Sequence, residues 1–317
     1  MWARWLLSGV LLLVGCGAES VTPPTPDAST LTPTLAPTLA PTSPTGAAPT
    51  TSPFTSPTSP TITVPVLPDL TDRGIVEGAD ASWPQCPAGM GIPQKRSHGA
   101  PMPLDSAEFV ILGLTNGPGF HPNPCLAEQV AWVRERHLLA AAYSVISWPS
   151  EQQVQQYGGQ GPFEAASTLG RLANAGYQQA LFNLRTMRAA GLDSPAVWLD
   201  VEPVPDFDWP ADLEQNAAVV RGAAQGYADQ GLLVGVYSTT SLWQRVVGDL
   251  GLGLQEWRAA GQTSREEALA RCDQSRSIQG GSALLAQWVE ALPDGARDRN
   301  VTCPGASAYL SLWFHAY

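Results

Sequence analysis

The chain carries little positive charge. Its 317 residues include 17 Lys and Arg against 28 Asp and Glu, a net charge of -11, and Lys95 is the one lysine. No segment forms a basic stripe. Because nucleic-acid binding depends on many Lys and Arg contacts to phosphates, we expect no nucleic-acid partner.

The spacing patterns of several kinds of site are also missing. The sequence has no C-x-x-C pair, no glycine-rich phosphate loop after its first expected strand and no serine in a G-x-S-x-G elbow. The four histidines show neither metal-ligand nor catalytic-triad spacing: His98, His121, His137 and His315. We therefore expect no metal, no cofactor and no nucleotide site.

The longest apolar run near the start is too short to span a bilayer. It extends from Trp5 to Val14, follows Arg4, and is typical of a signal-peptide core. The stretch LLLVGC then resembles the bacterial lipobox, which implies cleavage before Cys16 and lipid attachment to its thiol. An ordinary secretory signal with an incidental cysteine is the alternative. We expect a signal peptide over residues 1–15 and an extracytoplasmic protein, anchored to the bacterial cell membrane through the Cys16 lipid alone.

Composition changes sharply after this leader. From about Val21 to Leu70 the chain is almost entirely Pro, Thr, Ser and Ala, which cannot bury enough surface to offset chain entropy. Residues 16–73 are therefore expected to be a disordered, lipid-anchored tether. The remaining residues, 74–317, are long enough to form a full core, as one large domain or two small ones, and we expect a monomer.

Four cysteines remain once Cys16 is assigned to lipid. An even set in an exported chain indicates two disulfides. Three pairings are possible, and we favour Cys86–Cys125 with Cys272–Cys303 because each pair is local in the sequence.

The folded part alternates between strand-like and helix-like segments. Strands are expected at 76–83, 108–115, 138–147, 196–202, 232–239, 254–261 and 283–290. Helices are expected at 125–137, at 163–191 with a break or bend near Gly176, at 212–231, and at 241–248 with Ser241 as its cap. Apolar strands that alternate with helices imply a mainly parallel sheet, and seven or eight of them in about 240 residues fit a single β/α (TIM-like) barrel in the α/β class.

Polar residues gather where these strands end. The active sites of β/α-barrels lie at the carboxyl ends of the strands. Those ends carry Asp80 with Ser82, Trp83 and Gln85 just beyond, Asn116, Ser144, Asp200 with Glu202, Tyr237 with Ser238, Trp257, and Gln287 with Trp288.

Asp200 and Glu202 are the strongest catalytic candidates. Two apart on a strand, they face the same side, and in a partly dry site such carboxyl groups drive their pKa values apart. One proton donor beside one carboxylate is what glycoside hydrolysis requires. Asp80 would complete the acidic cluster, beside Trp83, Tyr237 and Trp257, whose flat faces suit sugar rings. The competing interpretation is an ion pair within the core.

Several segments together resemble the family 25 glycoside hydrolases, the N-acetylmuramidase lysozymes. They are GADASWPQ (78–85), FVILGLTNGPGF, LLAAAYSVIS, VWLDVE and GLLVGVYSTTSLW. The resemblance covers about 78–303. It implies a β/α-barrel that cleaves the β-1,4 bonds of peptidoglycan.

The resemblance also implies residue roles. Glu202 would be the general acid and Asp200 an orienting or stabilising group, with Asp80 supplying negative potential. Tyr237 and Gln287 would touch substrate, and Asp298 would match an acid of the last strand. The first motif has alanine in place of isoleucine and valine, and Pro84 and Cys86 constrain the mouth, so the cleft is expected to differ.

Three functions remain open at this point. The chain is an anchored glycosidase acting on peptidoglycan or another N-acetylated glycan, an inactive glycan-binding lipoprotein, or a structural lipoprotein whose acids form a hydrated ion network.

Overall fold

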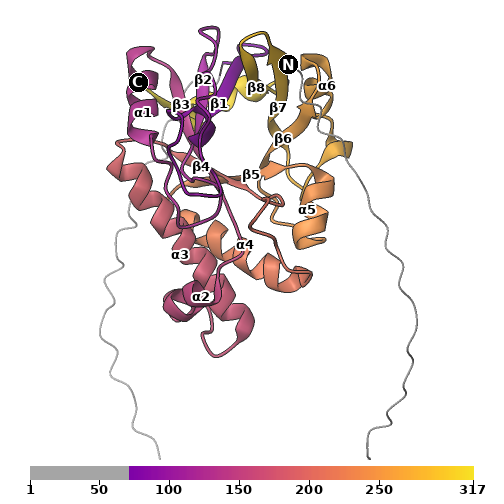
Figure 1. Cartoon of the computed structure of the whole chain (residues 1–317). Helices are drawn as coiled ribbons and strands as arrows, with labels where there is room; N and C mark the ends of the chain where they lie inside the picture. The colour runs from indigo at the N-terminus through magenta and orange to yellow at the C-terminus, as the bar shows by residue number, and fades with distance from the viewer. Residues whose placement is uncertain (1–70) are drawn as a thin grey trace, which may run out of the picture. The chain divides into compact units, whose positions relative to one another are not determined.

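Residues 71–317 are described by the computed structural model (Figure 1). The expected signal peptide, Cys16 and nearly all of the expected tether lie outside the described residues. Within residues 71–317, no helix is long and apolar enough to cross a membrane.

Eight strands close into a barrel. They are β1 (Glu77–Ala81), β2 (Phe109–Gly113), β3 (Leu139–Val145), β4 (Ala196–Asp200), β5 (Leu233–Ser238), β6 (Gln255–Gln262), β7 (Ala283–Leu292) and β8 (Gly295–Thr302). Each pairs with the next, and β8 pairs back to β1. The expected barrel is therefore present.

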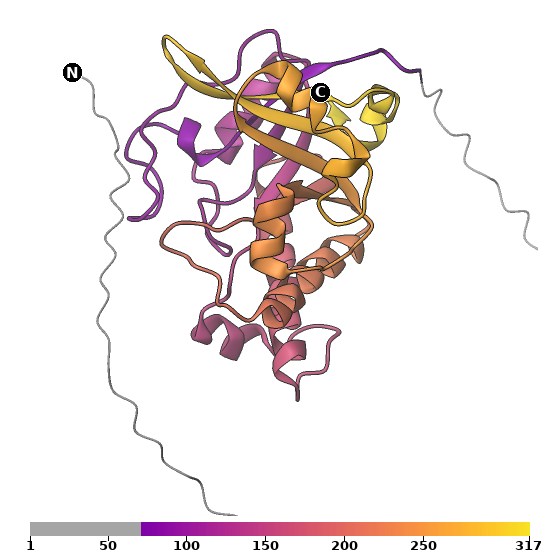
Figure 2. The same ribbon diagram turned by 90° about the vertical axis from the view of Figure 1, so that its right-hand side faces the viewer.

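The barrel is not parallel throughout. Strands β1 to β7 are parallel to one another, whereas β8 is antiparallel to both of its neighbours, β7 and β1. Figure 2 shows the gold hairpin of β7 and β8 projecting beyond the strands beside it. The alternating strand–helix pattern did not predict β8, because its polar sequence, GARDRNVT, lacks an apolar run.

Helices lie outside the strands (Figures 1 and 2). They are α1 (Leu126–Glu135), α2 (Glu151–Tyr157), α3 (Thr168–Ala189), α4 (Leu213–Ala228), α5 (Thr240–Val247), α6 (Arg265–Ala270) and α7 (Leu310–Trp313). Three 3-10 turns add η1 (Trp83–Gln85), η2 (Gln274–Arg276) and η3 (Ala306–Tyr309). In α1, for example, Leu126, Val130 and Val133 recur at helical spacing and are buried.

Two details of the helices differ from expectation. Helix α3 is continuous through Gly176. A Cβ there would lie 2.0 Å from the carbonyl oxygen of Val219, so this glycine lets α3 and α4 pack backbone to backbone. The cap of α5 is Thr239, whose hydroxyl accepts from the N–H of Leu242, and Ser241 lies inside the helix.

The apolar residues form an outer and an inner core. Alternate strand residues, such as Val110 and Val197, share a cluster with helix residues such as Val219. The intervening residues, including Ile111 and Trp198, form a second cluster that contains no residue of α1 to α6. Because side chains alternate across a strand, the second cluster fills the barrel interior.

The C-terminal segment closes the amino-terminal end of the barrel. Trp313 stacks on Trp198 at 4.6 Å between ring centroids, and Phe314 lies 4.9 Å from Phe109. Strand β9 (His315–Ala316) pairs with the start of β3. A ligand therefore has access from the opposite end, where the parallel strands finish.

Two disulfides cross-link segments that flank the barrel strands. They join Cys86 to Cys125 and Cys272 to Cys303, the pairing favoured from the sequence. The first ties the segment after β1 to the start of α1.

Candidate active site

Strand β4 delivers two carboxylates to the barrel mouth. It ends at Asp200, and Glu202 follows outside the strand, because Pro203 has no N–H with which to extend the ladder. Val201 is buried in the outer core, so its two neighbours point to the opposite side, toward the mouth. Asp200 is buried, whereas Glu202 remains partly exposed.

Asp80 of β1 is held by two amides on neighbouring strands. Its Oδ2 atom accepts from Gln287 Nε2 at 2.9 Å and from Asn300 Nδ2 at 2.7 Å. Asp80 is 7% exposed. These bonds orient the carboxyl group, while burial raises its pKa to about 8, helped by the nearby charge of Asp298.

Asp298 joins the same group from β8. Burial raises its pKa to about 6. Its charge in turn raises the pKa values of Asp80 and Glu202, although burial is the larger cause for both. Asp298 was predicted from the family resemblance, whereas Asp80 and Glu202 were predicted from the ends of strands. The charge of Asp298 acts on both of those acids.

Tyr237 marks the point where the four acids converge. Burial raises the pKa of its hydroxyl, and the charges of Glu202, Asp200, Asp80 and Asp298 raise it further. The backbone geometry agrees for two of these acids, because Asp200 is the register partner of Tyr237 and Asp80 is joined to Tyr237 through Gln287.

None of the four acids is neutralised by a cation. Among residues 71–317, no Lys, Arg or His nitrogen lies within 4.0 Å of a carboxylate oxygen of these residues. The buried Oδ1 atom of Asp200 has no hydrogen-bond partner in the described part of the chain. The ion-pair interpretation of these acids is therefore not supported.

Such an unpaired cluster favours retained protons. Burial raises the pKa of Asp200 well above its ordinary range, and the charges of Glu202 and Asp80 add to this. Burial likewise raises the pKa of Glu202. One carboxyl group can then keep a proton near neutral pH beside an ionised one, which is the arrangement that acid–base catalysis needs.

A hydrogen-bond relay links Tyr237 to Asp80. The tyrosine hydroxyl donates to Gln287 Oε1 at 2.7 Å, and the amide nitrogen of Gln287 donates to Asp80. Because Gln287 is engaged at both ends, its amide is oriented. Both residues predicted to touch substrate thus also position an acid.

The three predicted aromatic residues take different positions. Trp83 is partly exposed in η1, the turn that follows β1. Trp257 is 1% exposed, packs against Tyr237 at 4.3 Å and donates to Asn300 Oδ1 at 2.7 Å. Trp257 therefore has no free face for a sugar, and it supports the site from below.

Gln85 holds the turn that carries Trp83. Its Oε1 atom accepts from the N–H of Ser82 at 2.8 Å, and Gln129 of α1 donates to the Ser82 carbonyl oxygen. With the Cys86–Cys125 disulfide, these contacts fix the position of the mouth segment.

Some residues expected on the rim face the other way. Ser144 bonds to the Tyr227 hydroxyl, Ser238 donates to the Val201 carbonyl oxygen, and Trp288 belongs to an outer cluster. Asn116 ties Ile92 to Lys95 within a loop. Because consecutive strand residues point to opposite faces, only one of two neighbouring residues at a strand end can face the site.

Two residues of the site were missed. Asn300 donates to Asp80 and accepts from Trp257, and Tyr143 has a hydroxyl pKa raised by burial and by the charges of Asp80 and Asp200. Alternation offered a signal for both. Asn300 is two residues from Asp298 on β8, and Tyr143 is adjacent to Ser144, which faces outward.

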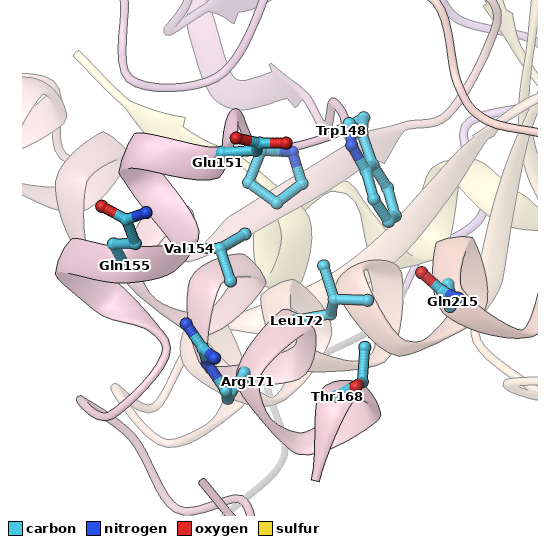
Figure 3. Close-up of a pocket in the computed structure, with 9 residues that line it drawn as sticks. Trp148, Glu151, Val154, Gln155, Thr168, Arg171, Leu172 and Gln215 are labelled. Carbon is cyan, nitrogen blue, oxygen red and sulfur yellow. The ribbon is translucent and has the colours of Figure 1, made fainter. Parts of the chain in front are cut away.

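Other features of the described residues do not compete with this cluster. Residues 71–317 contain no group of three or more His, Cys, Asp or Glu side chains arranged to hold a metal ion. A hollow of about 290 Å³ lies beside α2 and α3 (Figure 3), but Glu151 is its one acidic lining residue. This hollow therefore lacks the group of acids found at the barrel mouth.

The chain is similar to known proteins over a segment that includes part of this site. A family model described as "Lysozyme-like protein 1" matches residues 168–270, from the start of α3 to the end of α6. The match covers β4 and β5, hence Asp200, Glu202 and Tyr237.

Individual proteins match over shorter or more divergent stretches. The chain is 41% identical over 70 residues to "Counting factor 45-1" of Dictyostelium discoideum, covering 22% of this chain and 23% of that protein. It is 34% identical over 70 residues to "Lysozyme-like protein 5" of Caenorhabditis elegans, covering 22% and 31%. The chain thus spans less than a third of the length of these curated relatives.

A solved structure is similar over more of the chain. "The structure of a family GH25 lysozyme from Aspergillus fumigatus" has a TM-score of 0.47 at 15% identity and covers 75% of this chain and 99% of that chain. Independently of that structure, the family model matches the segment that carries Asp200, Glu202 and Tyr237.

Proposed function

We propose that residues 74–317 are a glycoside hydrolase domain that cleaves β-1,4 bonds of peptidoglycan, as a muramidase does. The observation that carries the proposal is the convergence of Asp80, Asp200, Glu202 and Asp298 at one end of the barrel without a cationic partner in the described residues. Two members of the cluster, Asp200 and Glu202, lie within the lysozyme-like match, which supports the choice of substrate.

Glu202 is the proposed general acid. It is the partly exposed member of the β4 pair, so a glycosidic oxygen can approach it, and burial together with the Asp298 charge raises its pKa. Asp200, deeper and without a partner at Oδ1, orients the attacking group or stabilises positive charge in the transition state. Asp80 is fixed by two amides, and because burial raises its pKa to about 8, it adds negative potential beneath the sugar once pH rises above that value.

Release of reducing ends from peptidoglycan by the purified chain tests this proposal. The Glu202→Gln variant should lose at least 100-fold in rate, because general acid catalysis contributes about 10²- to 10⁴-fold. Glu214→Gln, an exposed position on α4, is the matched control and should leave the rate unchanged. An inert wild-type chain on peptidoglycans of several chemotypes would refute the proposal.

Glycan binding without cleavage is the second candidate, and the partly exposed indole of Trp83 favours it. In that case insoluble cell wall would retain the chain with no turnover. Binding would survive Glu202→Gln and be lost in Trp83→Ala.

We further propose that Cys16 carries a lipid that anchors the chain to a bacterial membrane. The lipobox-like LLLVGC supports this. A Cys16→Ser chain should lose incorporation of labelled fatty acid, whereas unchanged labelling would contradict the anchor.

A further inference from the structure

A second hollow lies on the carboxyl-terminal side of the barrel, outside the acidic cluster. Its volume is about 400 Å³. Its walls come from the ends of β5 and β6, the start of α5 and the segment around η2, and they are formed by Thr239, Thr240, Ser241, Arg258, Ala259, Ala260, Gly261, Arg271, Arg276 and Ile278.

The lining of this hollow is cationic, in contrast to the mouth. It holds three arginines and no acid. Arg258 is engaged, because its guanidinium pairs with Glu256 and donates to the carbonyl oxygens of Arg271 and Asp273. Those bonds fix the backbone that carries the other two arginines.

Arg271 and Arg276 are not used by the fold in this way. Neither forms an ion pair within residues 71–317. The Nε atom of Arg271 is buried and has no hydrogen-bond partner in the described part of the chain. A buried N–H donor without a partner costs about 1–3 kcal/mol, so such a group indicates an acceptor that the chain itself does not provide.

The surrounding polar groups define what would fit. The hydroxyl of Ser241 is exposed and bonds to Thr239, while Thr240 donates to the carbonyl oxygens of Arg276 and Ser277. Asp273 accepts from the N–H of Ser275, and these Ser275 hydrogen bonds, followed by the charge of Arg276, lower the pKa of its carboxyl group. Two guanidinium groups and a hydroxyl make a donor set suited to a carboxylate or a phosphate.

The hollow lies next to the proposed active site. Its lining residue Ala259 is the register partner of Gln287, which donates to Asp80. Tyr237 of the site is two residues before Thr239 of the hollow.

We infer that this hollow binds an oxyanion, a carboxylate or a phosphate, on a substituent of the glycan whose sugar backbone lies at the acidic mouth. The inference rests on the proposed function for the identity of the glycan. It assigns to Arg271 and Arg276 the selection of acidic over neutral glycans, because the carboxylates at the mouth repel negative charge.

Calorimetric titration of the full chain tests the inference. The probes are a peptidoglycan fragment that carries its peptide carboxylates and the same fragment after those carboxylates have been converted to neutral amides. The Glu202→Gln background prevents turnover. The acidic fragment should bind about tenfold more tightly, since charge-assisted hydrogen bonds are worth about 1.5–3 kcal/mol and 1.4 kcal/mol is tenfold.

Arg271→Gln and Arg276→Ala should each reduce that preference, and Arg276 is exposed, so its replacement spares the core. Arg245→Ala, an exposed position on α5 outside the hollow, is the matched control. A glycan bearing phosphodiesters that binds with the same arginine dependence would support the oxyanion site and identify phosphate as the source.

Equal affinity for the two fragments, or a preference that survives both arginine variants, would overturn the inference. If the chain still cleaves peptidoglycan in that case, the proposed function stands alone. Absence of binding by either fragment would overturn both.

Discussion

Asp298→Asn should stabilise the fold at alkaline pH while it harms the site. The Asp298 carboxyl group has no hydrogen-bond or ion-pair partner in the described chain, and burial raises its pKa from 3.8 to about 6. Each pKa unit corresponds to about 1.36 kcal/mol, so the folded state loses about 3 kcal/mol once this group is ionised in both states.

The direction of the pH dependence follows from the two pKa values. Below pH 3.8 the group is protonated in both states, so it does not destabilise the fold. As pH rises, the unfolded chain releases the proton first, so the stability contribution falls until pH passes about 6. The neutral amide has no such loss. The variant should therefore match wild type near pH 3.5 and exceed it by about 3 kcal/mol near pH 8.

Urea unfolding followed by tryptophan fluorescence at pH 3.5, 6 and 8 measures this difference, with an unchanged denaturant slope as the check on two-state behaviour. Asp294→Asn is the matched control. Asp294 is exposed and pairs with Arg297, which lowers its pKa, so its replacement should not stabilise the fold at pH 8. A stability gain from Asp298→Asn that is the same at pH 3.5 and 8 would refute burial as the cause of the raised pKa.

Two further predictions concern the chemistry. The kcat/KM for glycan should fall as pH rises, because the Glu202 acid must be protonated. Asp298→Asn should move this fall to lower pH, because it removes a charge that raises the pKa of Glu202. A pH profile that does not move would contradict the coupling. Tyr237→Phe should lower the free energy of unfolding by about 1 kcal/mol and should lower kcat, because Gln287 loses the donor that orients its amide toward Asp80. Tyr309→Phe, at an exposed tyrosine, is the control and should change neither quantity.

Much of the barrel could be predicted from the sequence because its parallel strands carry continuous apolar runs. Asp200 could be placed at the mouth because it ends such a run, and Asp80 because it lies near the end of the first strand. Strand β8 has no such run, and Asn300 was missed with it.

Side-chain depth was harder to predict than strand position. Trp257 of β6 lies under Tyr237 of β5 and against Asn300 of β8, which is 43 residues away in the sequence. The alternation of side chains predicts on which face of a strand a residue lies, but not which other residues bury it. Gly176 shows the same limit, because a glycine that breaks a helix and one that admits a neighbouring helix look alike until the partner, here Val219 of α4, is known.

The closure of the barrel's amino-terminal end has a consequence for the order of folding. Trp313 and Phe314 seal an interior built by strands that begin more than 100 residues earlier, and the N–H of Tyr317 donates to the Leu138 carbonyl oxygen. A ribosome that releases the chain from its N-terminus exposes β2 to β4 long before the segment that seals them. The barrel therefore cannot complete its interior during synthesis of its first half, and contacts of such long sequence separation favour slow, post-synthetic closure.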